Sequence, residues 1–161
     1  MMSSYQLPPP AQVLNLLKGL LGMPITVQEQ KKAASPWTPA MAAVYFANDD
    51  TISALLLCDL AGANQLGAAL SLLFPAVALE NIKAKRICEA TLENLREICN
   101  VGVNLFTQPG SPRLRLRDVL IASTAPLPAD VQQATRKATS RLNLDVEVPR
   151  YGRGQLALAV L

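Results

Sequence analysis

The sequence predicts an α/β domain of the α+β type, in which helices pack against a mostly antiparallel sheet. Helix-like and strand-like hydrophobic patterns are intermixed along the chain, and strand pairs joined by short turns outnumber strand–helix–strand units. Of the 161 residues, 50% are hydrophobic and 17% are charged, a balance typical of a chain that buries its own core. We therefore expect one domain covering residues 1–161.

The elements of the first half follow from hydrophobic spacing. They are a helix at 13–21, a strand at 25–28, a loop at 30–39, strands at 42–47 and 51–58, and a helix at 60–73. Gly22 and Pro24 supply the stop signal of the first helix, and residues 48–50 form the turn of a hairpin. The polar loop, which holds Trp37, is expected to be exposed and mobile. Asp59 suits the N-cap of the second helix, which is nearly apolar all round and should be buried.

The second half is expected to contain a long helix, a strand, a surface helix and a terminal pair of strands. These are a helix at 79–106, a strand at 113–121, a helix at 129–142 and strands at 145–148 and 155–161 around a turn at 151–154. In the strand at 113–121, leucines alternate with Arg113, Arg115 and Arg117, which predicts one buried face and one arginine face. The apolar terminal strand is expected to form a sheet edge that needs pairing, which suggests a homodimer.

The composition excludes several classes of function. The chain contains no histidine, which rules out phosphohistidine relays, histidine-based triads and histidine-bearing metal sites. The net charge of +3 is too small an excess to predict nucleic-acid binding. The apolar stretches are too short or too interrupted to span a membrane, and residues 1–10 lack the features of a signal peptide. Any chemistry must therefore use carboxylates, amides, hydroxyls, thiols, lysine or arginine.

The cysteines indicate the compartment in which the protein works. Cys58, Cys88 and Cys99 are odd in number, show no CxxC spacing and lie in apolar or helical stretches. We therefore expect reduced thiols within the core, which are typical of the cytoplasm. The position of Cys99 on its helix points toward the core and indicates a packing role.

A stripe of acids and amides on the long helix is the feature most suggestive of chemistry. Its members share one helix face within an arc of roughly 40–60°. They are Glu93, Glu97, Asn100 and Asn104. Leu95, Ile98 and Phe106 lie on the opposite side, so we expect the stripe to face solvent. The plain alternative to a functional site is the solvated face of an amphipathic helix.

The segment from Glu93 to Asn104, ENLREICNVGVN, resembles the signature helix of the CheC/CheX/FliY phosphatases, which carries Asp or Ser, three residues, Glu, two residues and Asn. Glu97 and Asn100 match its two functional positions, and Asn104 resembles an asparagine that often follows in this family. Glu93 stands where the family has Asp or Ser. The expected order of elements is also similar to that of CheX across most of the chain. Only one Glu-x-x-Asn is present, so one site per chain is expected, as in CheX.

The resemblance implies a protein phosphatase that hydrolyses phosphoaspartate on a CheY-like response regulator in chemotaxis or two-component signalling. Glu97 and Asn100 would then be the catalytic residues, and Glu93 and Asn104 would contact the partner. In this family the acid pairs with a lysine beside the phosphorylation site of the partner. The chain is expected to carry no cofactor and no metal site of its own, because Mg²⁺ would come with the response regulator.

The proposed chemistry is also reasonable without the family. A phosphoaspartate is an acyl phosphate that water attacks readily, so a phosphatase needs only to position that water in line with the leaving carboxylate. The amide of Asn100 can both accept from and donate to a water molecule. Two alternatives stay open, namely a catalytically inactive binding module of the same fold and a scaffold subunit of a chemosensory or motility complex. The arginine face of the strand at 113–121 would contact an acidic partner or remain a solvated face.

Overall fold

A computed structural model describes residues 5–30, 37–47, 50–138 and 140–161. The strands form one sheet with the order β1-β5-β6-β3-β2-β4, and all neighbouring strands pair antiparallel. The strands are β1 (Thr26–Glu29), β2 (Met41–Phe46), β3 (Ile52–Cys58), β4 (Arg115–Ile121), β5 (Ser140–Val148) and β6 (Gly152–Val160). The helices are α1 (Pro10–Leu21), α2 (Leu60–Leu70), α3 (Pro75–Lys83), α4 (Glu89–Gly102) and α5 (Ala129–Lys137), with a 3₁₀ turn η1 (Val103–Leu105) after α4.

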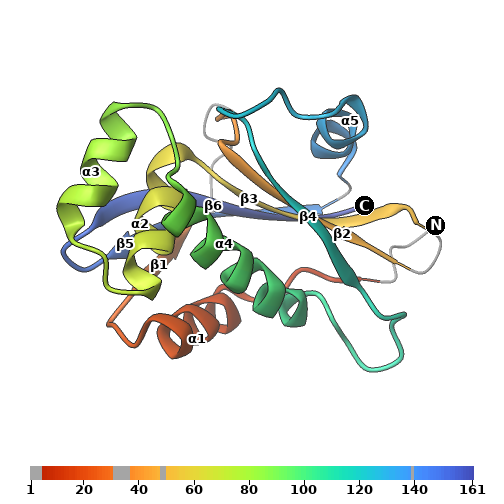
Figure 1. The fold of residues 1–161 in the computed structure, drawn as a ribbon. Helices are drawn as coiled ribbons and strands as arrows, with labels where there is room; N and C mark the ends of the chain where they lie inside the picture. Colours follow the sequence, from red (N-terminus) through yellow and green to blue (C-terminus); the bar gives the residue numbers. More distant parts are fainter. Residues whose placement is uncertain (1–4, 31–36, 48–49, 139) are drawn as a thin grey trace.

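The sheet carries helices on both faces (Figure 1). Helices α1, α2 and α4 pack on one face around the larger hydrophobic core, whereas α5 packs on the other face around a smaller one. Strand β2, which lies between β3 and the edge strand β4, is buried on both sides, with Met41, Ala43 and Tyr45 in the larger core and Ala42 and Val44 in the smaller. The prediction of a mostly antiparallel sheet covered by helices is confirmed.

Helix α2 begins at Leu60, as predicted, but ends at Leu70, three residues before the predicted end at 73. The Asp59 carboxylate accepts hydrogen bonds from Gly62 N (2.7 Å) and from Gln155 N (3.0 Å), so the N-cap also ties the helix to β6. Residues 62–69 are buried, as expected for a helix that is nearly apolar all round, and they include the polar Asn64 and Gln65.

The single long helix predicted at 79–106 is wrong, because the chain breaks between α3 and α4 and changes to 3₁₀ geometry after Gly102. Lys85 adopts a left-handed conformation (φ 56°). No glycine or proline lies in this segment, so the sequence gives no signal of the break. Side-chain contacts hold this break in place. Arg86 Nε donates to Asn81 Oδ1 (2.9 Å), and Asn64 Nδ2 donates to Arg86 O (3.1 Å).

The surface helix is also shorter than predicted. Helix α5 ends at Lys137 rather than at 142, and β5 already begins at Ser140. Every second residue of β5 from Leu142 to Val148 is buried, so burial of a period-two pattern overrides the helical tendency of this segment. The turn before β6 occupies residues 149–151, whereas the predicted turn is at 151–154. The observed turn therefore ends three residues earlier.

The predictions for the termini and loops have mixed outcomes. The terminal strand β6 lies between β5 and β3, so the prediction that it forms a sheet edge is wrong, and β1 and β4 are the edges. In the loop at 30–39, residues 31–36 lie outside the described part, and Trp37 is half-buried with the guanidinium of Arg141 5.4 Å from its ring centroid. Residues 48–49 of the predicted hairpin turn also lie outside it. Among the described residues, no helix is long and apolar enough to cross a membrane.

Helices α2 and α4 approach each other closely at Gly67. A Cβ atom at this position would lie 2.5 Å from Thr91 Cγ2 and 2.8 Å from the Thr91 carbonyl oxygen. Asn94 Nδ2 closes the same interface by donating to Gly67 O (2.8 Å) and to Ser71 Oγ (2.7 Å). A glycine is therefore required where α4 docks on α2.

We predict that Gly67→Ala lowers the free energy of unfolding by about 1–3 kcal/mol, because the methyl group meets backbone that cannot move aside. Urea unfolding measures this loss. Gly19→Ala is the matched control, because Gly19 lies in α1 and an added methyl group there would meet no atom within 4 Å. This control should be neutral or stabilising by up to about 1 kcal/mol. An unchanged unfolding midpoint for Gly67→Ala would contradict the close approach of the helices.

Candidate functional site

Helix α4 presents one face to the core and the other to solvent. Leu95, Ile98 and Cys99 are buried at 1%, 3% and 0% exposure, whereas Glu97 and Asn100 are exposed. Glu93 and Asn104 are exposed as well. The prediction that the acid and amide side chains face solvent is therefore confirmed.

Buried contacts fix the end of α4 that carries Asn100. Tyr45 Oη donates a hydrogen bond to the Cys99 carbonyl oxygen (2.6 Å), and its ring packs against Phe106 with 5.3 Å between centroids. Burial raises the pKa of Tyr45 well above its ordinary value, so the phenol stays protonated and remains a donor. A Cβ at Gly102 would lie 3.2 Å from Tyr45 Oη. The last turn of the helix therefore sits directly on β2.

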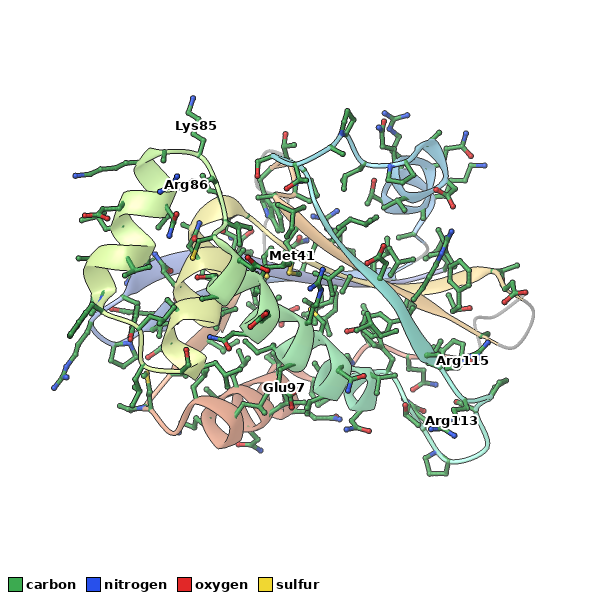
Figure 2. All side chains as sticks on the ribbon, viewed as in Figure 1. Met41, Lys85, Arg86, Glu97, Arg113 and Arg115 are labelled. Atoms are coloured by element: carbon green, nitrogen blue, oxygen red, sulfur yellow. The ribbon has the colours of Figure 1, made fainter. Side chains whose placement is uncertain are left out.

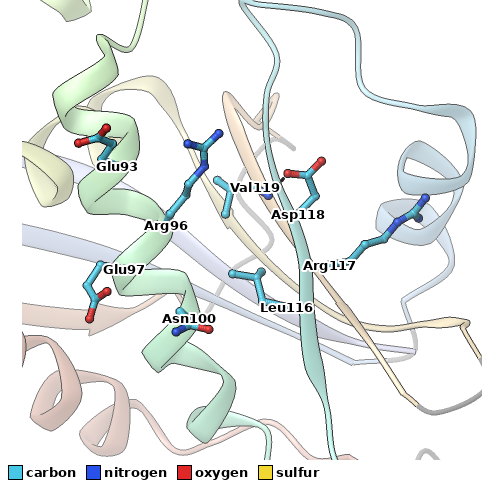
Figure 3. A pocket seen from close by; sticks show the side chains of 8 residues that line it. All are labelled: Glu93, Arg96, Glu97, Asn100, Leu116, Arg117, Asp118 and Val119. Atoms are coloured by element: carbon cyan, nitrogen blue, oxygen red, sulfur yellow. Dashed lines mark hydrogen bonds between the residues drawn. The ribbon is translucent and has the colours of Figure 1, made fainter.

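A cleft of about 370 Å³ runs between α4 and the edge strand β4 (Figure 3). Its lining combines charged, amide and apolar side chains from the two elements. The lining residues are Glu93, Arg96, Glu97, Asn100, Leu116, Arg117, Asp118 and Val119. The structure thus brings together Glu93, Glu97 and Asn100, which the sequence singled out, and adds Arg96 and Asp118, which sequence reasoning missed.

A second cleft of about 390 Å³ adjoins the first. It is lined by Asn100, Val103, Asn104, Thr107, Arg113, Leu114, Arg115 and Leu116. Asn100 and Leu116 line both clefts, so Asn100 lies where they meet. Asn104 belongs only to the second cleft, because α4 ends at Gly102 and Asn104 lies on η1.

The polar groups of this site are free to meet a partner. Within the described ranges, Glu93, Glu97, Asn100 and Asn104 form no hydrogen bond or ion pair through their side chains. The same part of the chain holds no group of three or more His, Cys, Asp or Glu residues that could hold a metal ion. The site therefore consists of exposed carboxylates and amides on a fixed helix.

The cleft wall on β4 is shaped by a β-bulge. Tyr45 pairs with Leu116 and Val44 pairs with Asp118, so Arg117 is the extra residue. The Arg117 guanidinium lies 4.5 Å from the Phe46 ring centroid, and Nη1 lies 3.6 Å from Asp130 Oδ2 on α5. Neither the bulge nor this contact can be read from the alternating sequence, although they set the position of the strand opposite α4.

The cysteines near the site differ in exposure. Burial raises the pKa of Cys99 to about 12 and that of Cys58 well above its ordinary value, so neither thiol ionises at neutral pH. Cys88 is only half-buried and precedes α4. Desolvation raises its pKa, but hydrogen bonds to Thr91 and Asn81 outweigh that effect, and the resulting pKa lies below the ordinary value. The prediction of core packing is confirmed for Cys99 and Cys58, and Cys88 is less buried than expected.

Comparison with known proteins shows the fold. No protein-family model and no curated protein matches this sequence. A chain in the crystal structure of the FliM–SpeE complex from H. pylori matches with a TM-score of 0.63 and 8% identity, covering 94% of this chain and 80% of that one. The CheX–CheY–BeF₃–Mg²⁺ complex from Borrelia burgdorferi contains a chain that matches with a TM-score of 0.55 and 13% identity, covering 91% and 90%. FliY from Thermotoga maritima matches with a TM-score of 0.50 and 11% identity, covering 91% and 81%.

The structure therefore has a CheC/CheX/FliY-like fold, and the fold expected from the resemblance of the α4 sequence is confirmed. The FliM middle domain from H. pylori shares this fold, with a TM-score of 0.58 and 9% identity. At these identities the likeness concerns the fold, so the role of the site must be argued from its own residues.

We predict that iodoacetamide alkylates Cys88 in the folded protein much faster than it alkylates Cys58 or Cys99, because the thiolate is the reactive form and only Cys88 is both accessible and low in pKa. Peptide mass spectrometry after timed quenching measures the three rates. In urea, all three cysteines should react. Equal rates for Cys99 and Cys88 in the folded protein would show that the buried face of α4 opens.

Proposed function

We propose that this protein is a CheX-like phosphatase that hydrolyses phosphoaspartate on a CheY-like response regulator. The observation that carries the proposal is the joint placement of Glu97 and Asn100, which are exposed and line one cleft on a helix fixed to the core. The spacing of these two residues resembles the signature of the phosphatase family, and a solved structure of the same fold is a complex of CheX with CheY. The reaction class is therefore hydrolysis of an acyl phosphate.

In this proposal Asn100 orients the attacking water. Its amide accepts one hydrogen bond from the water and donates another, which fixes the direction of the lone pair that attacks phosphorus. The phosphoryl group leaves the aspartate carboxylate, which needs no protonation as a leaving group at neutral pH. The contribution of the enzyme is therefore position, and a fixed helix serves this purpose well.

Glu97 has a different part in the proposal. Its exposed carboxylate pairs with a lysine beside the phosphorylation site of the partner and so holds the partner over Asn100. Glu93 and Asn104 lie on either side along the same surface and contact the partner there. We assign the Mg²⁺ ion to the response regulator, so no step depends on a metal ligand from this chain.

A second candidate function is a binding or scaffold module without catalysis. Two observations favour it. The fold is shared with the FliM middle domain, and Glu93 stands where the phosphatases have Asp or Ser. The same surface of α4 would then bind a partner without accelerating hydrolysis.

We also propose a cytoplasmic homodimer, but through a different strand from the one first expected. Because β6 is central, the open edges are β1 and β4, and β4 flanks the proposed site. Pairing through β1 would leave the cleft accessible.

Light scattering should report twice the mass of the chain, and a proline substitution at Val27 should reduce it to the monomer mass without changing the fold. A monomer at high concentration would contradict the dimer and leave the catalytic proposal untouched.

We predict opposite signatures for substitutions at the two central residues. Asn100→Ala should lower the rate of dephosphorylation by about 100-fold or to the rate of the partner alone, while binding survives, because only the water-orienting amide is lost. Glu97→Lys should weaken binding by about 10-fold or more, because it repels the lysine of the partner. A phosphate-release assay and a binding titration separate the two effects.

Matched controls for this experiment lie elsewhere on the surface. Asn15 on α1 and Glu80 on α3 are exposed, so Asn15→Ala and Glu80→Lys make the same chemical changes away from the cleft. Both controls should behave as the wild type. Hydrolysis by Asn100→Ala at the wild-type rate would remove the catalytic role and favour the binding module.

A further inference from the structure

The two adjoining clefts differ in charge. The first cleft has a mixed lining of three carboxylates and two guanidinium groups, from Glu93, Glu97, Asp118, Arg96 and Arg117. The second contains Arg113 and Arg115 and no acidic residue in its lining. The surface along α4 and β4 therefore changes from mixed charge, with one carboxylate in excess, to purely basic, and Asn100 lies at the boundary because it lines both clefts.

The arginines of the second cleft are available for a ligand. Arg113 and Arg115 are exposed, and within the described residues neither forms an ion pair or a hydrogen bond through its side chain. Arg117 differs, because it already contacts Phe46 and Asp130. Figure 2 shows Arg113 and Arg115 at the start of β4, beyond the end of α4, with Glu97 further back along the helix.

An exposed pair of guanidinium groups beside amides is suited to anions. Arginine keeps its charge at every physiological pH and binds carboxylates or phosphates through two parallel hydrogen bonds. Asn104 adds an amide donor to the same cleft, whereas the hydroxyl of Thr107, which also lines it, already donates to Val103 O (3.0 Å). Leaving these guanidinium groups without an acidic neighbour costs little in water, but it makes the cleft selective for a negatively charged partner surface.

We infer that Arg113 and Arg115 form an anion-binding end of the site, which receives carboxylate side chains of the partner protein that border its phosphorylated aspartate. This inference rests on the proposed function and adds a second, opposite charge to the docking surface. The Glu97 carboxylate meets a cation of the partner, and the arginine end meets its anions. Two contacts of opposite sign fix the orientation of the partner over Asn100, which one ion pair through Glu97 cannot do.

Charge reversal tests this inference. The probe is a purified CheY-like receiver domain loaded with BeF₃ and Mg²⁺, which allows binding to be titrated without hydrolysis. Arg113→Glu combined with Arg115→Glu should weaken binding by about 10-fold or more and reduce its dependence on salt. At saturating phosphorylated partner, the rate of dephosphorylation should stay within about twofold of the wild-type rate, because Asn100 is intact.

The matched control is Arg136→Glu combined with Lys137→Glu on α5, which makes the same change in net charge at exposed positions. Unfolding midpoints of both double variants should equal that of the wild type. Unchanged binding of the Arg113/Arg115 variant, or equal weakening by the control, would overturn the inference. A loss of the saturated rate with unchanged binding would also overturn it, because the arginines would then contact the phosphoryl group itself.

Failure of the anion-binding end and failure of the phosphatase proposal give different results. If Asn100→Ala abolishes hydrolysis while the arginine variant binds normally, only the anion-binding end is wrong. If the wild type binds through the arginines but never accelerates hydrolysis, the anion-binding end stands and the phosphatase proposal fails.

Discussion

The docking of α4 on the sheet and on α2 determines what this surface can do. The hydrogen bond from Tyr45 to the Cys99 carbonyl and the close approach of Gly67 to Thr91 hold the helix from two sides. Each fully buried apolar side chain on its inner face adds about 1.5–3 kcal/mol. Turning the helix would expose that face, so the residues opposite it must remain in solvent. The site therefore consists of solvent-exposed side chains on a helix whose opposite face is buried.

Much of this arrangement can be predicted from the sequence. The predictions that proved wrong have physical reasons. The period of α4 separates Leu95 and Ile98 from Glu97 and Asn100 whatever the helix packs against, so exposure of the site follows from spacing. The break at Lys85 depends on side-chain contacts from distant residues, which hydrophobic spacing does not encode. Three other features depend on which strands pair and could not be predicted either. They are the central place of β6, the bulge in β4 and the difference in charge between the two clefts.

The fold alone does not distinguish an enzyme from a scaffold, because the likeness to the FliM, FliY and CheX structures, at 8–13% identity, concerns the fold only. Both functions would use the same face of α4. A scaffold needs surface area and complementary charge, whereas a phosphatase also needs an amide held where water can attack phosphorus. In the proposed function Asn100 would supply that amide, and it lies where a cleft of mixed charge meets a basic one.

In the proposed function this chain accelerates the hydrolysis of phosphoaspartate on a receiver domain. The most direct measurement is a time course of phosphate release from an excess of phosphorylated CheY-like receiver domain, with the chain present in substoichiometric amount. We predict that the initial rate rises in proportion to the amount of chain and that each molecule releases many phosphates. If the chain binds the receiver but phosphate loss stays at the receiver's own rate, the protein is not a phosphatase and is a binding module instead.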